Sequence, residues 1–291
     1  MSYRTAAPRL PRAMAPRIGV GKASLVGFAM LATASWAYIL FGGDSGLADL
    51  FRTQTWREVW DFVRRLFGAG SPGTPALFDA QSWRTAAGLS VETLAMSVLA
   101  MVIAGVGALL TFIPASRNVA FGDLSSSRSP VSAAVFFVIR ALYVFTRGVP
   151  ELVWAMLIVF VLSPGIVPGA VALGIHNFGI LGKLSSEVVE GLDHRPMRAL
   201  RASGAGNFQM LAYGILPQAL PQLLTYLLYR WEVVIRTSIV VGFVAAGGLG
   251  REFRLRMSWL HYDDVLLLLV CYLILVLAVD LASAGLRRLA R

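Results

Sequence analysis

The sequence predicts an all-α, polytopic membrane protein with both termini on the cytoplasmic side and about six transmembrane helices. Composition is the first observation: 57% of the 291 residues are hydrophobic, 14% are charged, and the mean hydropathy is +0.68. These values are too apolar for an ordinary soluble domain. The second observation is that basic residues concentrate in the segments assigned to the cytoplasm, as the positive-inside rule requires.

The net charge of +10 does not indicate a nucleic-acid partner. The chain contains no recognisable nucleic-acid-binding module, and its arginines divide by side of the membrane. Its single cysteine, Cys271, lies in an apolar run without the His or Cys neighbours that a metal site needs. The sequence therefore predicts no metal site.

The first segments are a basic tail and an apolar helix. Residues 1–22 contain arginines, one lysine, three prolines and no acid, and are predicted to form a cytoplasmic tail. Residues 23–41 carry no charge and would cover about 28 Å as a helix. This length is greater than that of a typical signal-peptide core, which favours an uncleaved signal anchor.

A polar region with an amphipathic pattern follows at residues 42–83. Trp56 and Trp60 are typical of the aromatic belt at the outer membrane interface. A helix lying on the membrane surface and a contact for a soluble partner both remain open. Residues 23–86 are therefore assigned to the first transmembrane helix and an extracytoplasmic amphipathic segment.

A core domain of membrane spans is predicted at residues 87–286, followed by a short basic cytoplasmic tail at 287–291. Between the second and third spans, residues 131–147 carry Arg140 and Arg147, which predicts a segment along the cytoplasmic interface with snorkelling arginines. The third span, at 150–162, is too short to cross the membrane alone, so we expect the end of the preceding segment to form its first turn. The spans predicted in the core are 93–115, 150–162, 169–184, 215–247 and 265–286.

The fifth predicted span contains three charged residues, Arg230, Glu232 and Arg236. A charge at the centre of a transmembrane helix costs about 2.5–3.5 kcal/mol on insertion scales, so these groups should face a neighbour or a water-filled path. Glu232 and Arg236 can pair on one helix face, which leaves Arg230 as the remaining cation. A salt-linked cluster that fastens two halves of a dimer is the alternative to a substrate pathway.

Two further features of the spans have a structural and a functional interpretation. His176 lies in the fourth span, where a buried hydrogen bond between helices is as plausible as a role in the pathway. Gly247, Gly248 and Gly250 follow the fifth span. Because no strand precedes these glycines, we expect close packing or a hinge there rather than a nucleotide loop.

The loop between the fourth and fifth spans is polar, basic and marked by glycines. Residues 198–217 read RALRASGAGNFQMLAYGILP, in which Gly204 and Gly206 interrupt two short helical patterns. A helix-turn-helix outside the bilayer is predicted. A helix-turn-helix that protrudes from the bilayer suggests a contact with a partner protein. The alternative is an ordinary basic loop on the inner side of the membrane.

This loop resembles the cytoplasmic signature of bacterial ATP-binding-cassette importer permeases, which is Glu-Ala-Ala, three residues, Gly, nine residues, then Ile-x-Leu-Pro. The positions that match outright are Ala199, Gly204, Leu216 and Pro217. The positions that depart are Arg198, Leu200 and Gly214, where the signature has Glu, Ala and Ile.

Residues 147–250 resemble, more narrowly, the permeases of phosphonate importers. The similar strings are RGVPELVWAMLIVFV at 147–161, LGIHNFGILGKLSSEVVE at 173–190, LRASGA at 200–205 and YRWEVVIR at 229–236. The last of these contains the Tyr-Arg-aromatic-Glu pattern of those permeases, followed after three residues by Arg.

The resemblance implies a type I importer permease in the bacterial cytoplasmic membrane, which is not itself an enzyme. The implied partners are a second copy of this permease, two copies of a separate ATP-binding-cassette ATPase, and an extracytoplasmic substrate-binding protein. ATP and Mg would be bound by the ATPase, and this chain would hold no cofactor. The loop at 193–214 would couple to the ATPase, with Arg198 and Arg201 available to pair with its acidic groups.

The implied substrate is a phosphonate or a related phosphorus oxyanion such as phosphite or phosphate. Guanidinium groups match such oxygens bidentately, so Arg230 and Arg236, with Glu232 and His176, are the predicted pathway residues.

Two alternatives remain open. One is an ion-coupled secondary transporter, for which intramembrane acids such as Glu151, Glu187, Glu232 and Asp280 would be the candidates. The other is the same class of permease with an amino acid such as methionine as its ligand.

Overall fold

The computed structural model describes residues 19–41, 46–70, 73–121 and 129–289, and every regular element in these ranges is helical. The predicted all-α fold is confirmed. Most of the predicted basic N-terminal tail and the last two residues of the C-terminal tail lie outside the described residues. The chain divides into two compact units at residues 1–62 and 63–291.

The first unit contains α1 (Val20–Phe41), the 3-10 turn η1 (Leu47–Phe51) and the start of α2 (Thr53–Leu66). Helix α1 is long and apolar enough to cross a membrane, and none of its residues is buried. The indole nitrogen of Trp56 donates to the carbonyl of Leu50 at 3.0 Å, which ties the start of α2 to the turn before it. The placement of α2 at the outer interface stays a prediction.

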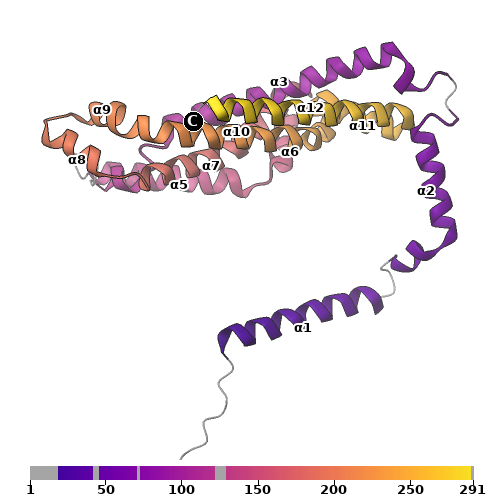
Figure 1. Ribbon diagram of the computed structural model, residues 1–291, viewed down its shortest axis with the longest axis horizontal. Coiled ribbons are helices and arrows are strands. Elements are labelled where there is room, and N and C mark those ends of the chain that lie inside the picture. Colours follow the sequence, from indigo (N-terminus) through magenta and orange to yellow (C-terminus); the bar gives the residue numbers. More distant parts are fainter. Residues whose placement is uncertain (1–18, 42–45, 71–72, 122–128, 290–291) are drawn as a thin grey trace, which may run out of the picture. The chain divides into compact units, whose positions relative to one another are not determined.

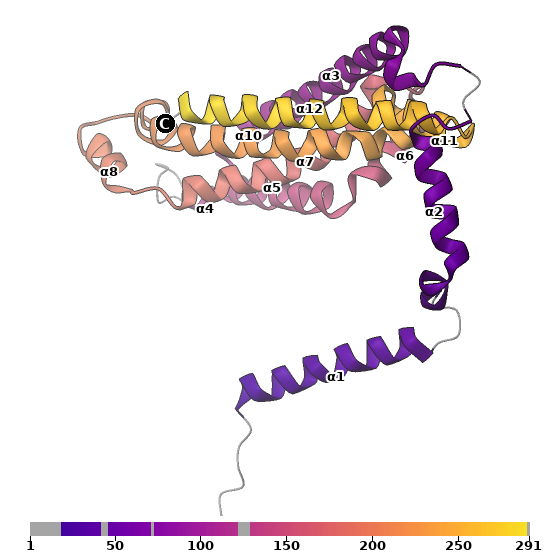
Figure 2. The ribbon, with the colours of Figure 1, turned by 45° about the vertical axis from the view of Figure 1, so that its right-hand side comes forward.

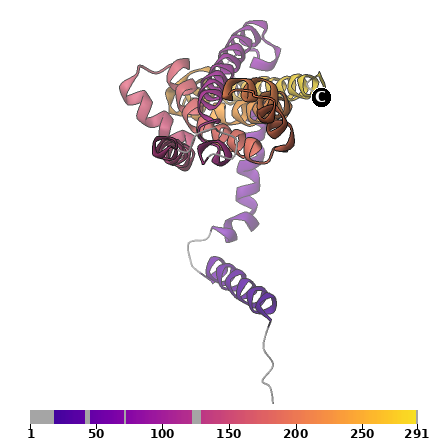
Figure 3. The same cartoon turned by 90° about the vertical axis from the view of Figure 1, so that its left-hand side faces the viewer.

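The second unit is a helical bundle (Figures 1 and 2). Its elements are η2 (Ala76–Phe78), α3 (Ala80–Thr111), α4 (Arg117–Ala120), α5 (Pro130–Gly148), α6 (Glu151–Val161), α7 (Ile166–Glu190), α8 (Arg195–Ala202), α9 (Asn207–Gln209), η3 (Met210–Ile215), α10 (Leu216–Val241), η4 (Gly242–Ala246), α11 (Gly248–Ser258) and α12 (Tyr262–Leu289). Figure 3 shows the helices of this unit nearly end-on.

Helix α7 is central to the bundle, because it packs against α3, α5, α6 and α10. Small residues are the reason that these helices can approach it closely. The small residues of α7 that are buried include Ala170, Ala172, Gly174, Gly179, Gly182, Ser185 and Ser186. Helices α8 and α9 lie at one end of the bundle, and α6 and α11 lie at the other (Figures 1 and 2).

Asp79 begins α3. Its carboxylate accepts hydrogen bonds from the hydroxyl and the backbone N–H of Ser82, at 2.7 and 2.8 Å. These bonds, that of the Ser82 side chain first, lower the pKa of the Asp79 carboxyl below its ordinary value. This cap fixes where the long apolar helix α3 starts.

Among the described residues, five helices are long and apolar enough to cross a membrane, namely α1, α3, α5, α7 and α12. A sixth candidate is the run at residues 207–244 with α11, which is bent by 47°. The expectation of about six spans is therefore met, although the members of the set differ from those predicted.

Helix α5 is the element on which the prediction and the structure differ. It was expected along the membrane interface, but it packs along α7 within the bundle. Arg140 does not have to reach the interface to find a partner, because Glu190 of α7 provides one. Helix α6 has 11 residues, and a break at Val149 and Pro150 separates it from α5.

Candidate functional site

The predicted cytoplasmic loop is a turn between two short helices. Gly204 has a φ of +86°, a conformation that favours glycine, and it ends α8 by donating its N–H to the carbonyl of Arg201 at 3.0 Å. The N–H of Gly206 then donates to Oε1 of Gln209 at 2.9 Å, which starts α9. The local geometry is the helix-turn-helix that the two glycines predict.

Helix α8 has one buried and one exposed side. Met197 is 1% exposed and belongs to an apolar cluster with Val188, Val189 and Ile215, so it fastens α8 to the ends of α7 and α10. The outward side carries Arg198 and Ala199, both exposed.

Other signature residues of the loop are also accessible. Arg201 is half-buried, and Gly204, Leu216 and Pro217 are exposed. Within the described ranges, neither Arg198 nor Arg201 forms an ion pair. The loop therefore presents uncompensated positive charge on a helix that is anchored from behind.

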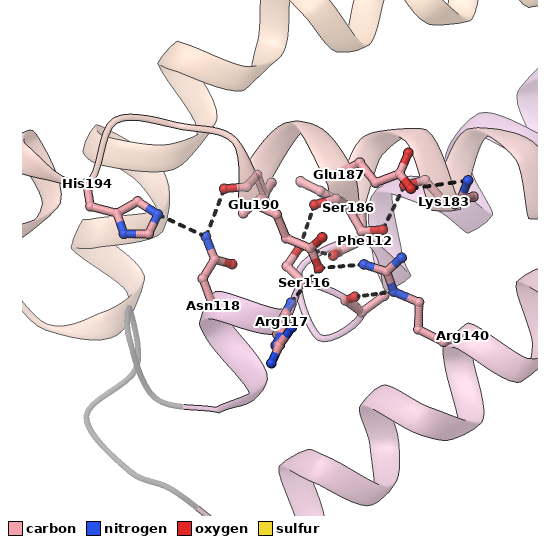
Figure 4. Close-up of polar contacts among 12 residues, drawn as sticks. Phe112, Ser116, Arg117, Asn118, Arg140, Lys183, Ser186, Glu187, Glu190 and His194 are labelled. Carbon is pink, nitrogen blue, oxygen red and sulfur yellow. Dashed lines mark hydrogen bonds and ion pairs between the residues drawn. The ribbon is translucent and has the colours of Figure 1, made fainter. Parts of the chain in front are cut away.

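A polar cluster lies at the end of α7, just before this loop (Figure 4). Oε1 of Glu190 accepts from Nη2 of Arg140 at 2.5 Å and from the backbone N–H of Arg117 at 2.7 Å. Nδ2 of Asn118 donates to the carbonyl of Val189 at 2.8 Å. Sequence reasoning missed this cluster, because its members lie far apart along the chain and no local spacing marks them.

A second polar group lies near the middle of α7 and α10. Nε and Nη2 of Arg230 both donate to Oδ1 of Asn177, at 2.9 and 2.6 Å. Asn177 is 1% exposed, and its own Nδ2 donates to the carbonyl of Leu173 at 2.8 Å. The guanidinium of Arg230 is thus held by a neutral acceptor rather than by a carboxylate.

His176 joins this group at the break between α5 and α6. Its Nδ1 lies 3.0 Å from the carbonyl of Val149, and its Nε2 lies 3.4 Å from Oε2 of Glu151. Since a carbonyl only accepts, Nδ1 carries a proton in this arrangement. Glu151 also interacts electrostatically with Arg230, so His176 and Arg230 share an acidic neighbour. Their role in a substrate pathway stays a prediction.

The predicted pairing of Glu232 with Arg236 is wrong. Glu232 accepts from Nη1 of Arg287 at 2.5 Å, and both oxygens of Asp280 accept from Nη2 of Arg236, at 2.9 and 2.6 Å. Helix α12 packs beside α10 and brings Asp280 close to Arg236 and Arg287 close to Glu232. These contacts between helices replace the weak ion pair that Glu232 and Arg236 could form along one helix. Both ion pairs form between helices of this chain.

The three predicted glycines pack closely where α10 passes into α11. Gly247 and Gly248 have φ values of +94° and +64°. A Cβ on Gly250 would lie 2.8 Å from the Cα of Gly242, and closer still to the backbone oxygen of Ile239. Backbone atoms occupy the space next to Gly250; a hinge role stays a prediction.

Gly250→Ala is therefore expected to lower the free energy of unfolding by about 3 kcal/mol, because over-packing against backbone cannot be relieved by a side-chain movement. Thermal unfolding of the purified chain in mild detergent measures this. Gly88→Ala is the control, since a Cβ at that helical glycine meets no atom within 4 Å. Equal melting temperatures for the two variants would contradict the expectation.

Comparison with known proteins assigns the family. The family described as "binding-protein-dependent transport system inner membrane component" matches residues 125–291. The phosphite transport system permease protein PtxC of Stutzerimonas stutzeri is 38% identical over 198 residues, which are 68% of this chain and 68% of that protein. The phosphate-import permease protein PhnE of Mycolicibacterium smegmatis is 33% identical over 201 residues, which are 69% of this chain and 36% of that protein.

A solved structure supports the fold. The MetNI methionine ABC transporter in an inward-facing conformation contains a chain that is 21% identical, with a TM-score of 0.59 over 69% of this chain and 94% of that one. The family assignment decides against an ion-coupled secondary transporter and against an enzyme. The chain belongs to the binding-protein-dependent inner-membrane components, and it is a multi-pass permease subunit of a bacterial ATP-binding-cassette importer.

Proposed function

We propose that this permease imports a phosphonate or a related phosphorus oxyanion, phosphite or phosphate, and that it works as a homodimer. Two copies of a separate ATPase would bind ATP and Mg on the cytoplasmic side, and an extracytoplasmic binding protein would deliver the ligand. Both termini of the permease lie in the cytoplasm in this arrangement, and the chain itself needs no cofactor. The ligand class agrees with the names of the relatives PtxC, a phosphite transport system permease, and PhnE, a phosphate-import permease.

The observation that carries the ligand class is the Arg230 group. A doubly charged oxyanion entering the apolar region must exchange its hydration for fixed donors. Arg230 offers a planar fork of donors, and its present acceptor, Asn177, is neutral and therefore weaker than an incoming oxyanion. His176 belongs to the same polar group, with its Nδ1 donating to the carbonyl of Val149.

Coupling to ATP hydrolysis would run through the loop at 193–214. Its outward face carries Arg198 and Arg201 without acidic partners among the described residues, which suits a surface that meets acidic groups of the ATPase. Arg198 stands where the permease signature has an acid, so this contact has the opposite charge in our proposal. Because α8 is fastened to α7 and α10 through Met197, a displacement of the loop would move both helices.

The test is the ATPase activity of the complex in lipid, assembled from this permease, its ATPase and its binding protein. Phosphonate, phosphite, phosphate and methionine are added in turn. We expect stimulation by at least one phosphorus oxyanion and none by methionine. Stimulation by methionine alone would overturn the ligand class, and failure of any ATPase to associate would overturn the arrangement of subunits.

A further inference from the structure

Three chain segments meet at the carboxylate of Glu190, the last residue of α7 before the loop (Figure 4). Arg140 comes from α5, and the backbone N–H of Arg117 comes from the start of α4. Arg140 uses a second donor, Nε, to reach the carbonyl of Ala115 at 2.9 Å. One carboxylate and one guanidinium thus connect the end of α7 with the middle of α5 and with the turn that follows α3.

Neighbouring bonds strengthen the same junction. The hydroxyl of Ser116 lies 3.4 Å from the carbonyl of Ser186, and Asn118 is bonded to the carbonyl of Val189. Nδ2 of Asn118 also lies 3.4 Å from Nε2 of His194, which directly precedes α8. The bonds therefore continue from the end of α7 into the first residues of the loop.

Glu187, one turn earlier on α7, provides a contrast. Its carboxylate pairs with Lys183 of the same helix at 3.2 Å and is more exposed than that of Glu190, 44% against 28%. An exposed pair within one helix contributes little to stability and connects nothing. Glu190 differs from Glu187 in that it bonds two other segments, although both acids have the same charge and lie about one turn apart on the same helix.

We infer that Glu190 is a positioning residue for coupling, in that it makes the end of α7, the middle of α5 and the turn after α3 move together when the loop is displaced. This inference rests on the proposed function, in which the ATPase moves the loop. Without the junction, α7 would shift with α8 while α3 and α5 stayed behind. ATP would then be hydrolysed without opening the path at the inner end.

The test is the amount of ligand transported per ATP hydrolysed in the reconstituted complex, for Glu190→Gln and Arg140→Gln. Glu190→Gln keeps an oxygen that can accept from the N–H of Arg117, so the chain retains part of the junction and folds. We expect each variant to lower the ratio about fivefold or more, while ATP hydrolysis continues. Because the two residues form one unit, the double variant should be no worse than either single one.

Glu187→Gln is the matched control and should leave the ratio unchanged. A ratio for Glu190→Gln equal to that of the control, or effects of the two single variants that simply add, would overturn the inference. If the wild-type complex itself transports no ligand on ATP hydrolysis, the proposed function fails, and the inference fails with it. A coupled wild type with a coupled Glu190→Gln variant overturns the inference alone.

Discussion

Arg230→Ala is expected to reduce ATP-driven uptake of the phosphorus oxyanion about thirtyfold or more, because the half-buried guanidinium would no longer pair with the ligand, and truncating one partner of such a charged pair costs several kcal/mol. The guanidinium of Arg230 donates two hydrogen bonds to Oδ1 of Asn177, and both of these donors would be lost in the alanine variant. Arg230→Lys keeps the charge but loses the planar fork, so we expect an intermediate rate. Uptake of radiolabelled ligand into proteoliposomes measures both.

Arg236→Ala is the comparison for this prediction. The guanidinium of Arg236 is bonded to both oxygens of Asp280 on α12, so its fork is already occupied by a carboxylate. We expect a smaller loss of uptake than for Arg230→Ala. Unchanged uptake in an Arg230→Ala complex that assembles fully would contradict the assignment of the pathway to Arg230.

Asn177→Asp is expected to slow uptake about tenfold, because charge-assisted hydrogen bonds are roughly twice as strong as neutral ones. The new carboxylate would hold the fork of Arg230 in a buried ion pair, and the oxyanion would have to displace it. Asn177→Ala is the matched variant, since it frees the fork without adding a charge. Initial uptake rates over a range of ligand concentrations separate the two effects.

The Asn177 prediction concerns the competing acceptor rather than the helix packing. Both substitutions disturb the hydrogen bond to the carbonyl of Leu173, so a purely structural defect would lower uptake in both alike. The expected result is a larger loss for the aspartate variant. An aspartate variant that transports as fast as the alanine variant would show that Asn177 does not compete with the ligand.

Local patterns were enough to predict the elements that depend on neighbours in the chain. Gly204 and Gly206 predict the turn between α8 and α9, and the structure forms it, because a positive φ and a helix start are local requirements. The uncharged runs predict most of the apolar helices for the same reason. Helix α5 was expected at the interface because Arg140 was interpreted without its partner, Glu190 of α7.

The pairing of charges could not be predicted, since it depends on which helices pack side by side. Glu232 and Arg236 have the spacing for a pair along one helix, but Arg287 and Asp280 of α12 approach from the side and bind them instead. Glu190 has no local feature that distinguishes it from Glu187. In both cases the decisive partner is brought close only by the tertiary fold.

The central claim is that the loop at 193–214 couples ATP hydrolysis to transport, and Gly204 tests it most directly. Its φ is +86°, and a Cβ there meets no atom within 4 Å, so a substitution acts through backbone conformation alone. Valine strongly disfavours this conformation, whereas asparagine tolerates it. The measurement is ligand transported per ATP hydrolysed, in reconstituted complexes of wild type, Gly204→Val and Gly204→Asn.

We predict that the Gly204→Val complex still assembles but transports almost no ligand per ATP hydrolysed. The Gly204→Asn complex should transport most of the wild-type amount of ligand per ATP. This result would show that the conformation of the turn between α8 and α9, rather than its bulk, transmits the movement. A fully assembled Gly204→Val complex that transports as much ligand per ATP as wild type would contradict the central claim.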